Sequence, residues 1–473
     1  MTYTKTTWLA GDDITAAKLN NMEGQYDAAK ADFGPVTTTV TIGKENESLH
    51  ALGADYTVSA GSTSAEDTIN TAINAIVTYG GEIMLLEGTY TIDGPIQLKD
   101  GITLSGMGPN TIIKLKDGFN SNISMVTHYT QAAPGNKNMT IKDLTINGNE
   151  ANQTSGTTNG IYFVNCTDTT TRIIVRNCYL LDFRSGVGVY VDTSKSVIVD
   201  KCVVKGADVA GVYGSTSTFS VVNNTINNST DGIYLSGCSD CVVANNDIFS
   251  NTSDGLHFVS TTVRTAVTGC TLYNNGESGL RINGSTYNNV VGNVFRNNTG
   301  AGALIESASN YTTLVGNSFY LNQINVKVDT SHYCLMAGNT CSYATQHGIY
   351  FNAANWACVS SNVVYMNGYH GIYLYNNSRC NLENNNVSAN SQGATASYQN
   401  IMLDTSSSNS VTGNLCHRGG GPIYPQYGIR IASGSYNLVT ANYLKDGGSA
   451  GAISDSGTST DKTAWMAAGN KTS

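Results

Sequence analysis

The sequence predicts an all-β chain that folds as a right-handed parallel β-helix, with coils of three short strands and about 23 residues each. Three observations carry this prediction. They are a short strand segment that recurs at a nearly constant spacing, an asparagine column with the same period, and a composition rich in turn residues. A short N-terminal α-helix and a helical cap are expected to precede the coils.

The recurring segment is a strand that begins near a Gly or Asn and alternates apolar with polar residues. Its second residues are 160, 188, 211, 232, 255, 279, 302, 325, 348, 371, 400 and 428. Most steps are 21 to 24 residues, and the longer ones indicate inserted loops. These segments predict twelve stacked coils, which at about 4.8 Å per coil form a rod roughly 55 to 60 Å long.

A second column has the same period and lies between two apolar strands of each coil. Its members are Asn224, Asn246, Cys270, Asn293, Asn317, Asn339, Asn362, Asn385, Asn414 and Asn442. Buried amides one coil apart can hydrogen-bond to one another, and asparagine tolerates the left-handed backbone of a sharp bend. We therefore expect a continuous asparagine ladder.

Composition excludes several classes of function. The 473 residues include 50 glycines and 6 prolines, which is typical of a turn-dense fold and not of a disordered linker. A net charge of -9 argues against a nucleic-acid partner, which would require a basic surface. No stretch approaches the roughly 18 apolar residues of a membrane span, and we expect neither membrane insertion nor a standard export signal.

The eleven cysteines are mostly placed inside apolar strand patterns. We expect them to be buried thiols. Cys238 and Cys241 form a C-x-x-C pair without a second ligand pair, and His347 and His370 stack in adjacent coils without a third ligand. The sequence therefore predicts no metal site at either place.

The chain divides into four regions by pattern. Residues 1–34 are predicted to hold an amphipathic helix with apolar residues at spacings of three and four. This helix is either a short coiled-coil seam for attachment and oligomerisation or a helix packed on its own rod. Residues 35–137 are expected to form the cap and first coils, residues 138–455 the repeats, and residues 456–473 a C-terminal tail.

The cap contains the second predicted helix. Ser64 and Asp67 have the spacing of a capping box, and Gly80-Gly81 ends the helix. Its apolar stripe consists of Ile69, Ile73, Ile76 and Val77. We expect this helix to cover the open edge of the first coil.

The third residue of the recurring segment should point outward, because the second and fourth are apolar. In chain order these residues are Tyr162, Tyr190, Tyr213, Tyr234, His257, Arg281, Leu304, Lys327, Tyr350, Tyr373, Met402 and Arg430. The six tyrosines are predicted to form an exposed stripe that binds glycan, since tyrosine offers both an apolar ring and a hydroxyl. The alternatives are sheet stabilisation or contact with a partner subunit.

Two pairs of carboxylates are candidate catalytic groups. Asp231 and Asp254 occupy the same position in consecutive coils, so their mutual repulsion should raise the pKa of one of them. His257 and Arg281 follow on the outward stripe, and all four are predicted catalytic residues. The alternative is that an aspartate before a turn glycine serves the backbone.

Glu306 and Asp329 form the second candidate pair, since they lie in neighbouring coils. Glycoside chemistry uses two carboxyl groups about 5 to 10 Å apart. Such a pair could instead bind Ca²⁺. Apart from that option, no cofactor is expected.

The chain also resembles known proteins. Residues 55–119, with the sequences Glu-Gly-Thr-Tyr and LSGMGPNTII, resemble the N-terminal cap of the pectate-lyase-like superfamily, and the coils resemble its repeats. The first 30 residues, with Trp8 and Gly11-Asp12, resemble a leader of bacteriophage tail and tail-spike proteins. That resemblance implies a virion protein, usually a homotrimer, that recognises and sometimes cleaves a cell-surface glycan.

The expected function is therefore that of a virion tail protein that binds, and in one version degrades, a host surface polysaccharide. Its expected partners are that polysaccharide, other tail or baseplate proteins, and two further copies of the chain. One alternative is a free-standing extracellular polysaccharide lyase, hydrolase or epimerase. The other is a structural adhesin without catalysis.

Overall fold

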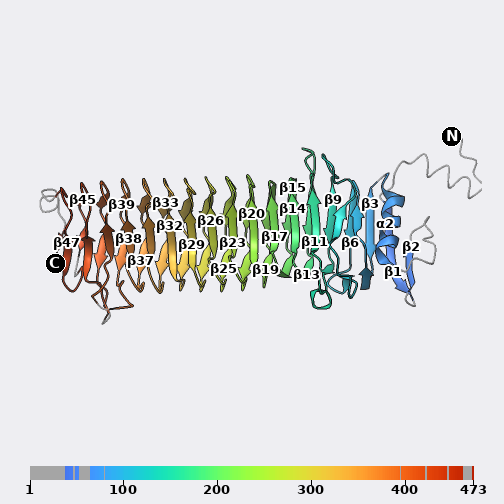
Figure 1. Cartoon of the computed structure of the whole chain (residues 1–473), viewed down its shortest axis with the longest axis horizontal. Helices are drawn as coiled ribbons and strands as arrows, with labels where there is room; N and C mark the ends of the chain where they lie inside the picture. The colour runs from blue at the N-terminus through green and yellow to red at the C-terminus, as the bar shows by residue number, and fades with distance from the viewer. Residues whose placement is uncertain are drawn as a thin grey trace, which may run out of the picture.

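The computed structural model describes residues 38–45, 48–52, 64–78, 80–394, 396–420, 423–444, 447–461 and 471–472. They form a long rod of stacked coils (Figure 1). Three sheets of 17, 16 and 15 strands run along it, and the solenoid makes about 16 turns of about 23 residues. The predicted fold class is confirmed. The helix predicted within residues 1–34 lies outside the described residues.

Sheet A holds 17 strands. Their bounds are β1 Thr38–Glu45, β2 Ser48–Leu52, β3 Gly81–Leu85, β6 Ile102–Ser105, β9 Met139–Lys142, β12 Ile173–Arg176, β15 Lys195–Asp200, β18 Thr218–Val222, β21 Val242–Ala244, β24 Ala266–Thr268, β27 Asn289–Val291, β30 Thr313–Val315, β33 Leu335–Ala337, β36 Cys358–Ser360, β39 Asn381–Glu383, β42 Ser410–Thr412 and β45 Leu438–Thr440. β1 and β2 pair antiparallel, and the other pairings are parallel.

Sheet B holds 16 strands, all parallel. Their bounds are β4 Gly88–Ile92, β7 Thr111–Leu115, β10 Thr145–Asn147, β13 Tyr179–Phe183, β16 Val203–Ala207, β19 Thr225–Asn227, β22 Asp247–Phe249, β25 Thr271–Tyr273, β28 Val294–Arg296, β31 Ser318–Tyr320, β34 Thr340–Ser342, β37 Val363–Tyr365, β40 Asn386–Ser388, β43 Leu415–His417, β46 Tyr443–Leu444 and β48 Lys471–Thr472.

Sheet C holds 15 parallel strands and contains the recurring segment. Their bounds are β5 Ile96–Leu98, β8 Ile123–His128, β11 Thr158–Val164, β14 Val187–Asp192, β17 Ala210–Ser215, β20 Asp231–Ser236, β23 Leu256–Val259, β26 Leu280–Asn283, β29 Ala301–Glu306, β32 Ile324–Asp329, β35 Ile349–Asn352, β38 Ile372–Tyr375, β41 Ile401–Asp404, β44 Tyr427–Ile431 and β47 Gly451–Asp455. The twelve predicted segments are the strands from β11 to β44.

Alternation within each strand decides which side chains form the core. In β20, Ile233 and Leu235 are fully buried, whereas Tyr234 between them is half-buried on the outer face. Parallel pairing repeats this arrangement, so that identical side chains stack from coil to coil. Phe295 and Phe319, for example, stack in the core with ring centroids 4.7 Å apart.

The asparagine ladder is confirmed. Asn293 and Asn317 show the pattern, because the side-chain amide of Asn293 donates to Oδ1 of Asn317 at 3.1 Å and to a backbone carbonyl of the previous coil at 2.9 Å. The expected left-handed backbone lies one residue earlier, as at Gly292 with φ of 66° and Gly316 with φ of 64°. The ladder asparagines themselves therefore serve as hydrogen-bonding groups, while the preceding residue makes the bend.

A second ladder at another corner was not predicted. Its members are Asn251, Asn275, Asn298, Asn322, Asn325, Asn367, Asn390 and Asn400, joined by amide hydrogen bonds of 2.9 to 3.1 Å. The signal for it in the sequence is an asparagine that recurs five residues after members of the first ladder, as Asn298 does after Asn293.

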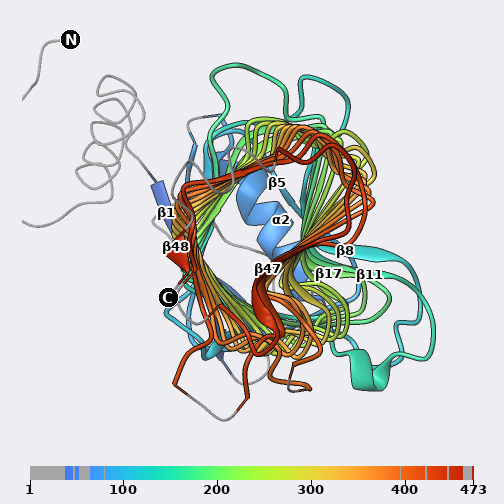
Figure 2. The same cartoon turned by 90° about the vertical axis from the view of Figure 1, so that its left-hand side faces the viewer.

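Helix α2, Ala65–Ile76, closes the first coils (Figures 1 and 2). Ser64 accepts a hydrogen bond from the backbone N–H of Asp67, as predicted. Three of the four predicted stripe residues, Ile69, Ile73 and Ile76, are buried against the coils. Seen along the rod, the helix lies across the interior outline of the coils, so its role as a lid is confirmed (Figure 2).

The cysteines agree with the sequence prediction. All eleven are free thiols, and only Cys358 is partly exposed. Among the helices that the structure describes, none combines the length and apolar character needed to cross a membrane.

Candidate functional site

The predicted outward residues form one column on the outer face of sheet C. Register pairs Tyr162 with Tyr190, Tyr234 with His257, and His257 with Arg281. The same register continues through the remaining predicted positions to the end of the series. We call these twelve residues, from Tyr162 to Arg430, the outer column. Because parallel strands repeat about every 4.8 Å, it presents a linear row of side chains.

The first four tyrosines of the outer column form a contact series. Ring centroids are 5.0 Å apart for Tyr162 and Tyr190, and 4.8 Å apart for each of the next two pairs up to Tyr234. Neighbouring rings cover part of each other, so the tyrosines are half-buried. The prediction of a freely exposed stripe was therefore wrong in this respect. Burial raises the pKa of Tyr190 to about 12, which keeps its hydroxyl neutral.

The other two tyrosines of the predicted glycan-binding set lie further along the rod. Tyr350 and Tyr373 stack with centroids 5.0 Å apart, next to the parallel pair of His347 and His370 at 5.4 Å. Leu304 and Lys327 separate this pair from Arg281 in the outer column. The six tyrosines therefore make two separate aromatic areas on one face.

Three of the predicted catalytic residues meet beside Tyr234. Nδ1 of His257 lies 3.4 Å from Oδ2 of Asp231 and 3.7 Å from Oδ2 of Asp254. The ring of His257 contacts Tyr234 edge-on, with centroids 5.1 Å apart. The structure thus joins the aromatic column directly to a charged centre.

Backbone requirements explain why the aspartates occur at these positions. Oδ1 of Asp231 accepts the backbone N–H of Asp254 at 3.0 Å, and Oδ1 of Asp254 accepts that of Ser278 at 2.7 Å. The glycine after Asp254 is needed because a Cβ on Gly255 would lie 2.6 Å from the carbonyl oxygen of Gly279. Each aspartate therefore has one structural oxygen and one that faces His257.

Asp254 is the most perturbed acid of this centre. It is fully buried, and burial raises the pKa of its carboxyl to about 6, with a smaller rise from the charge of Asp231. The backbone N–H of Ser278 and the charge of His257 act in the opposite direction. Because solvent does not reach Asp254, it can position His257 and Arg281 but cannot touch a glycan directly.

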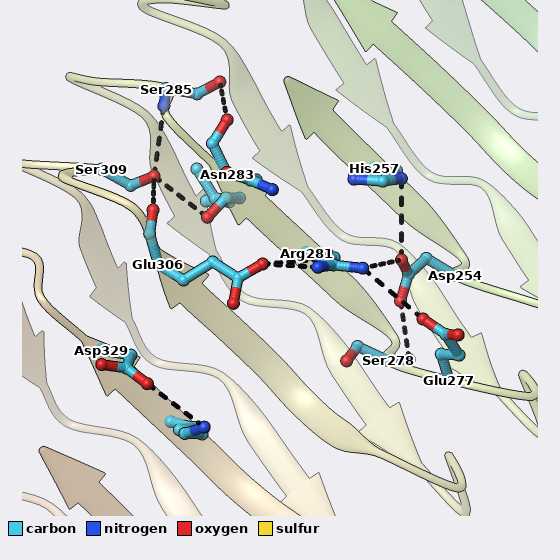
Figure 3. A network of polar contacts seen from close by, with 12 residues as sticks. Asp254, His257, Glu277, Ser278, Arg281, Asn283, Ser285, Glu306, Ser309 and Asp329 are labelled. Carbon is cyan, nitrogen blue, oxygen red and sulfur yellow. Dashed lines mark hydrogen bonds and ion pairs between the residues drawn. The ribbon is translucent and has the colours of Figure 1, made fainter. Parts of the chain in front are cut away.

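Arg281 lies between acidic groups of successive coils, as Figure 3 shows. Its guanidinium is 2.7 Å from Oε1 of Glu306, 3.6 Å from Oε2 of Glu277 and 3.9 Å from Oδ2 of Asp254. Burial alone would lower the pKa of Arg281, but Glu306 and the other carboxylates raise it, so the pKa lies above the usual value. The guanidinium is therefore held in one orientation at the surface.

The second predicted pair is divided between two ion pairs. Glu306 binds Arg281, while Asp329 lies 3.4 Å from the ammonium of Lys327 and accepts a hydrogen bond from Asn352 at 3.0 Å. Figure 3 shows the two acids in neighbouring strands with different partners. A joint catalytic role for this pair, or Ca²⁺ binding by it, stays a prediction.

Asp231, Asp254 and His257 could also hold a metal ion, because one donor atom of each lies within 4.8 Å of the others. Arg281 opposes metal binding, since its positive charge already faces Asp254.

The short separation of the Asp231 and Asp254 carboxyl groups also bears on hydrolysis, because inverting glycosidases place their carboxyl groups about 6.5 to 9.5 Å apart. Asp231 and Asp254 are too close for that arrangement.

Glu277 is part of the centre although its position in the sequence did not predict this. Glu277 is 57% exposed and contacts Arg281 from the turn before β26. Glu277 lies four residues before Arg281 in the sequence, a spacing that brings side chains together on a helix but not in a strand. Only the path of the turn brings the two side chains together.

Two family models match consecutive parts of the chain. One, described as a right handed beta helix region, matches residues 159–319, and the other, described as a periplasmic copper-binding protein (NosD), matches residues 327–464. Comparison with curated proteins found no match. The repeats and these matches define the chain as a right-handed parallel β-helix protein.

Several solved structures are similar to this chain. The N-terminal fragment of gene product 12 of bacteriophage Phi29 has a TM-score of 0.51 at 12% identity, over 82% of this chain and 89% of that chain. The A-module of Azotobacter vinelandii mannuronan C-5 epimerase AlgE4 gives 0.40 at 18% identity, over 85% and 94%. The Dettilon tailspike protein gives 0.40 at 16% identity, over 84% and 65%. The likeness to gene product 12 supports the fold that the repeats and the family models indicate, a right-handed parallel β-helix.

Proposed function

We propose that this protein binds a polysaccharide along the outer column of sheet C. The observation that carries the proposal is the uninterrupted series from Tyr162 to Arg281, in which four tyrosines with contacting rings lead directly to His257 and a fixed arginine. A linear polymer can contact such a row at successive residues. Tyrosine edges supply apolar surface, and their hydroxyls supply donors and acceptors for sugar hydroxyls.

The charge around Arg281 indicates the kind of sugar. Four carboxylates, those of Asp231, Asp254, Glu277 and Glu306, surround one arginine and one histidine. An excess of carboxylates repels a polyanion. It suits a neutral glycan, because sugar hydroxyls donate strong hydrogen bonds to carboxylate oxygens. We therefore propose a neutral, hydroxyl-rich polysaccharide.

A panel of neutral and acidic bacterial polysaccharides tests this binding. We expect the wild-type protein to bind at least one neutral glycan, and Tyr234→Ala to weaken its binding at least tenfold. Tyr320→Ala is the matched control, because Tyr320 is an exposed tyrosine on the outer face of sheet B. Equal affinity of the wild type and Tyr234→Ala, or binding confined to acidic glycans, would contradict the proposal.

We further propose that the protein is part of a phage tail and presents sheet C to the host surface. This rests on the resemblance of the first 30 residues to a tail leader, and it agrees with a fold that also occurs in phage proteins. Antibodies against the chain should label the tails of purified phage particles in electron micrographs. Recovery of the protein only from particle-free culture medium would favour the alternative of a free-standing extracellular protein.

A second candidate function is hydrolysis of the bound glycan. Glu277 and Glu306 both reach solvent and contact Arg281 from different sides, at 3.6 and 2.7 Å. Because a guanidinium group is only a few ångströms wide, the two carboxylates are at most about 9 Å apart, an upper limit that is compatible with the separations that glycosidases use. Glu277 and Glu306 fit this role better than the buried Asp254.

Release of reducing ends tests the second candidate. Glu277→Gln and Glu306→Gln should each lower the rate of release at least a hundredfold, because each removes one acid or base. The control is Glu383→Gln, which changes a partly exposed glutamate on sheet A. Glycan binding without release of reducing ends by the wild type would leave an adhesin without hydrolase activity.

A further inference from the structure

The outer column changes character at its N-terminal end. Register with β8 places Tyr162 next to Thr127, and Thr127 pairs with Gln97 of β5. The side chain that precedes the first tyrosine ring is therefore small. No aromatic ring stands before Tyr162 in the series, and a cavity of about 310 Å³ lies beside Thr127 and Gln97 at this end of the outer column.

The walls of this cavity combine two kinds of surface. Tyr162, Phe119 and Pro95 supply apolar walls, while Gln97 and Gln131 bring amides to it. Among the described residues that line it, the only carboxylate is that of Asp93, which forms an ion pair with Lys116 at 2.9 Å. The described lining residues therefore carry no unpaired charge, and they have the mixture of rings and hydrogen-bonding groups that sugar binding requires.

We propose that this cavity, which we call the end pocket, binds a single neutral sugar ring of the glycan, packed against Tyr162. The inference rests on the proposed function and adds the place where the glycan is anchored. The sugar would continue the series in which Tyr162 and Tyr190 are 5.0 Å apart. A charged peptide or nucleotide would leave its charge unpaired in such a pocket.

The floor and one wall of the end pocket are fixed by hydrogen bonds. Thr127 is 3% exposed, donates from its hydroxyl to the backbone oxygen of Tyr162 at 2.9 Å, and accepts from the side-chain amide of Gln131 at 3.4 Å. The backbone N–H of Gln97 donates to the side chain of Asn70 on α2 at 2.8 Å. The cap helix therefore supports the pocket before any ligand binds, which lowers the entropic cost of binding.

The end pocket also gives the bound glycan a direction. Tyr162 and Arg281 are five coils apart in the outer column, which corresponds to about 24 Å along the rod. A chain anchored in the end pocket would pass the tyrosines and reach Arg281 several sugars later. The end pocket would then determine which bond of the polymer lies beside Glu277 and Glu306.

Two variants test the end pocket with the glycan that the panel identifies. Gln97→Trp should fill the pocket, and Tyr162→Ala should remove its ring wall. We expect each to weaken binding at least tenfold in calorimetric titration, with the Tyr320→Ala control unchanged. Thermal unfolding followed by circular dichroism shows whether each variant is folded. If Tyr162→Ala does not fold, Gln97→Trp still tests the end pocket.

The outcomes separate the two proposals. Wild-type affinity in Gln97→Trp, together with loss of binding in Tyr234→Ala, would overturn the end pocket and leave the proposed function standing. Loss of binding in Tyr162→Ala but not in Gln97→Trp would also overturn it, because Tyr162 would then act only as a member of the outer column. Failure of the wild type to bind any glycan of the panel would overturn both.

Discussion

Two neighbouring histidines, the buried His370 and the partly buried His347, show how strongly the coils change the chemistry of individual residues. Burial lowers the pKa of His347 to about 4 and that of His370 to about 3. Nδ1 of His370 accepts the backbone N–H of Gln399 at 3.0 Å, which requires a neutral ring. Both imidazoles therefore stay neutral at pH 7, under the stacked pair of Tyr350 and Tyr373.

This burial predicts a loss of stability in mild acid. Below the ordinary histidine pKa of about 6.5, the unfolded chain takes up protons that the folded chain refuses, so the free energy of unfolding falls as pH drops towards about 3. From pH 7 to pH 5, His370 should account for about 2 kcal/mol of the decrease. Urea unfolding of wild type and His370→Gln at both pH values measures this difference.

His417→Gln serves as the control, because His417 lies half-buried on the outer face of sheet B. It should keep the pH dependence of the wild type. The same decrease in stability between pH 7 and pH 5 in wild type and His370→Gln would show that His370 does not titrate as described.

At the scale of elements, the two asparagine ladders hold the corners of the coils together. Each interior asparagine of these ladders satisfies buried backbone groups of the neighbouring coils as well as the next amide. Cys270 interrupts the first ladder, since Asn246 must direct its backbone N–H at the sulfur at 3.5 Å. A thiol is a weak acceptor, so this coil lacks one good hydrogen bond.

Cys270→Asn should therefore stabilise the protein by about 1 kcal/mol, because it restores the amide hydrogen bond to Asn246. Asn317→Leu is the opposite change and should cost about 3 kcal/mol, since it leaves several buried groups of the ladder unpaired. Chemical denaturation of both variants measures these free energies. A loss of stability in Cys270→Asn would mean that the corner cannot accommodate the larger amide.

The sequence predicted those features that depend on the period alone. Because coils stack directly, equal spacing of Tyr234, His257 and Arg281 was sufficient to place them side by side, and the same holds for Asp231 and Asp254. The remaining features depend on paths and contacts that a period does not contain. The turn that brings Glu277 to Arg281 and the partial covering of the tyrosine rings belong to this group, and so does the end pocket, which arises where Thr127 replaces a ring.

The whole molecule presents one continuous face to a long ligand. Sheet C runs through 15 coils, and its outer column changes from tyrosines to a charged centre and back to tyrosines. Sheet C continues across the predicted boundary at residue 137 between the cap region and the repeats, because β8 pairs with β11 there. A rigid rod of this kind holds its contact residues in place before binding, which favours affinity for an extended polymer.

Assembly is predicted at the same scale. The resemblance of residues 1–30 to a tail leader implies a homotrimer, so light scattering of the full-length protein should give a mass about three times 49.9 kDa. A mass equal to that of one chain would count against the trimer. Addition of salt should leave a trimer intact if its contacts are mainly apolar, as in a coiled-coil seam.

The most direct measurement is a crystal structure of the protein with an oligosaccharide cut from the bound glycan. We expect electron density for successive sugars over the outer column of sheet C, from the end pocket at Tyr162 towards Arg281. Sugar density confined to sheet A or sheet B would contradict it.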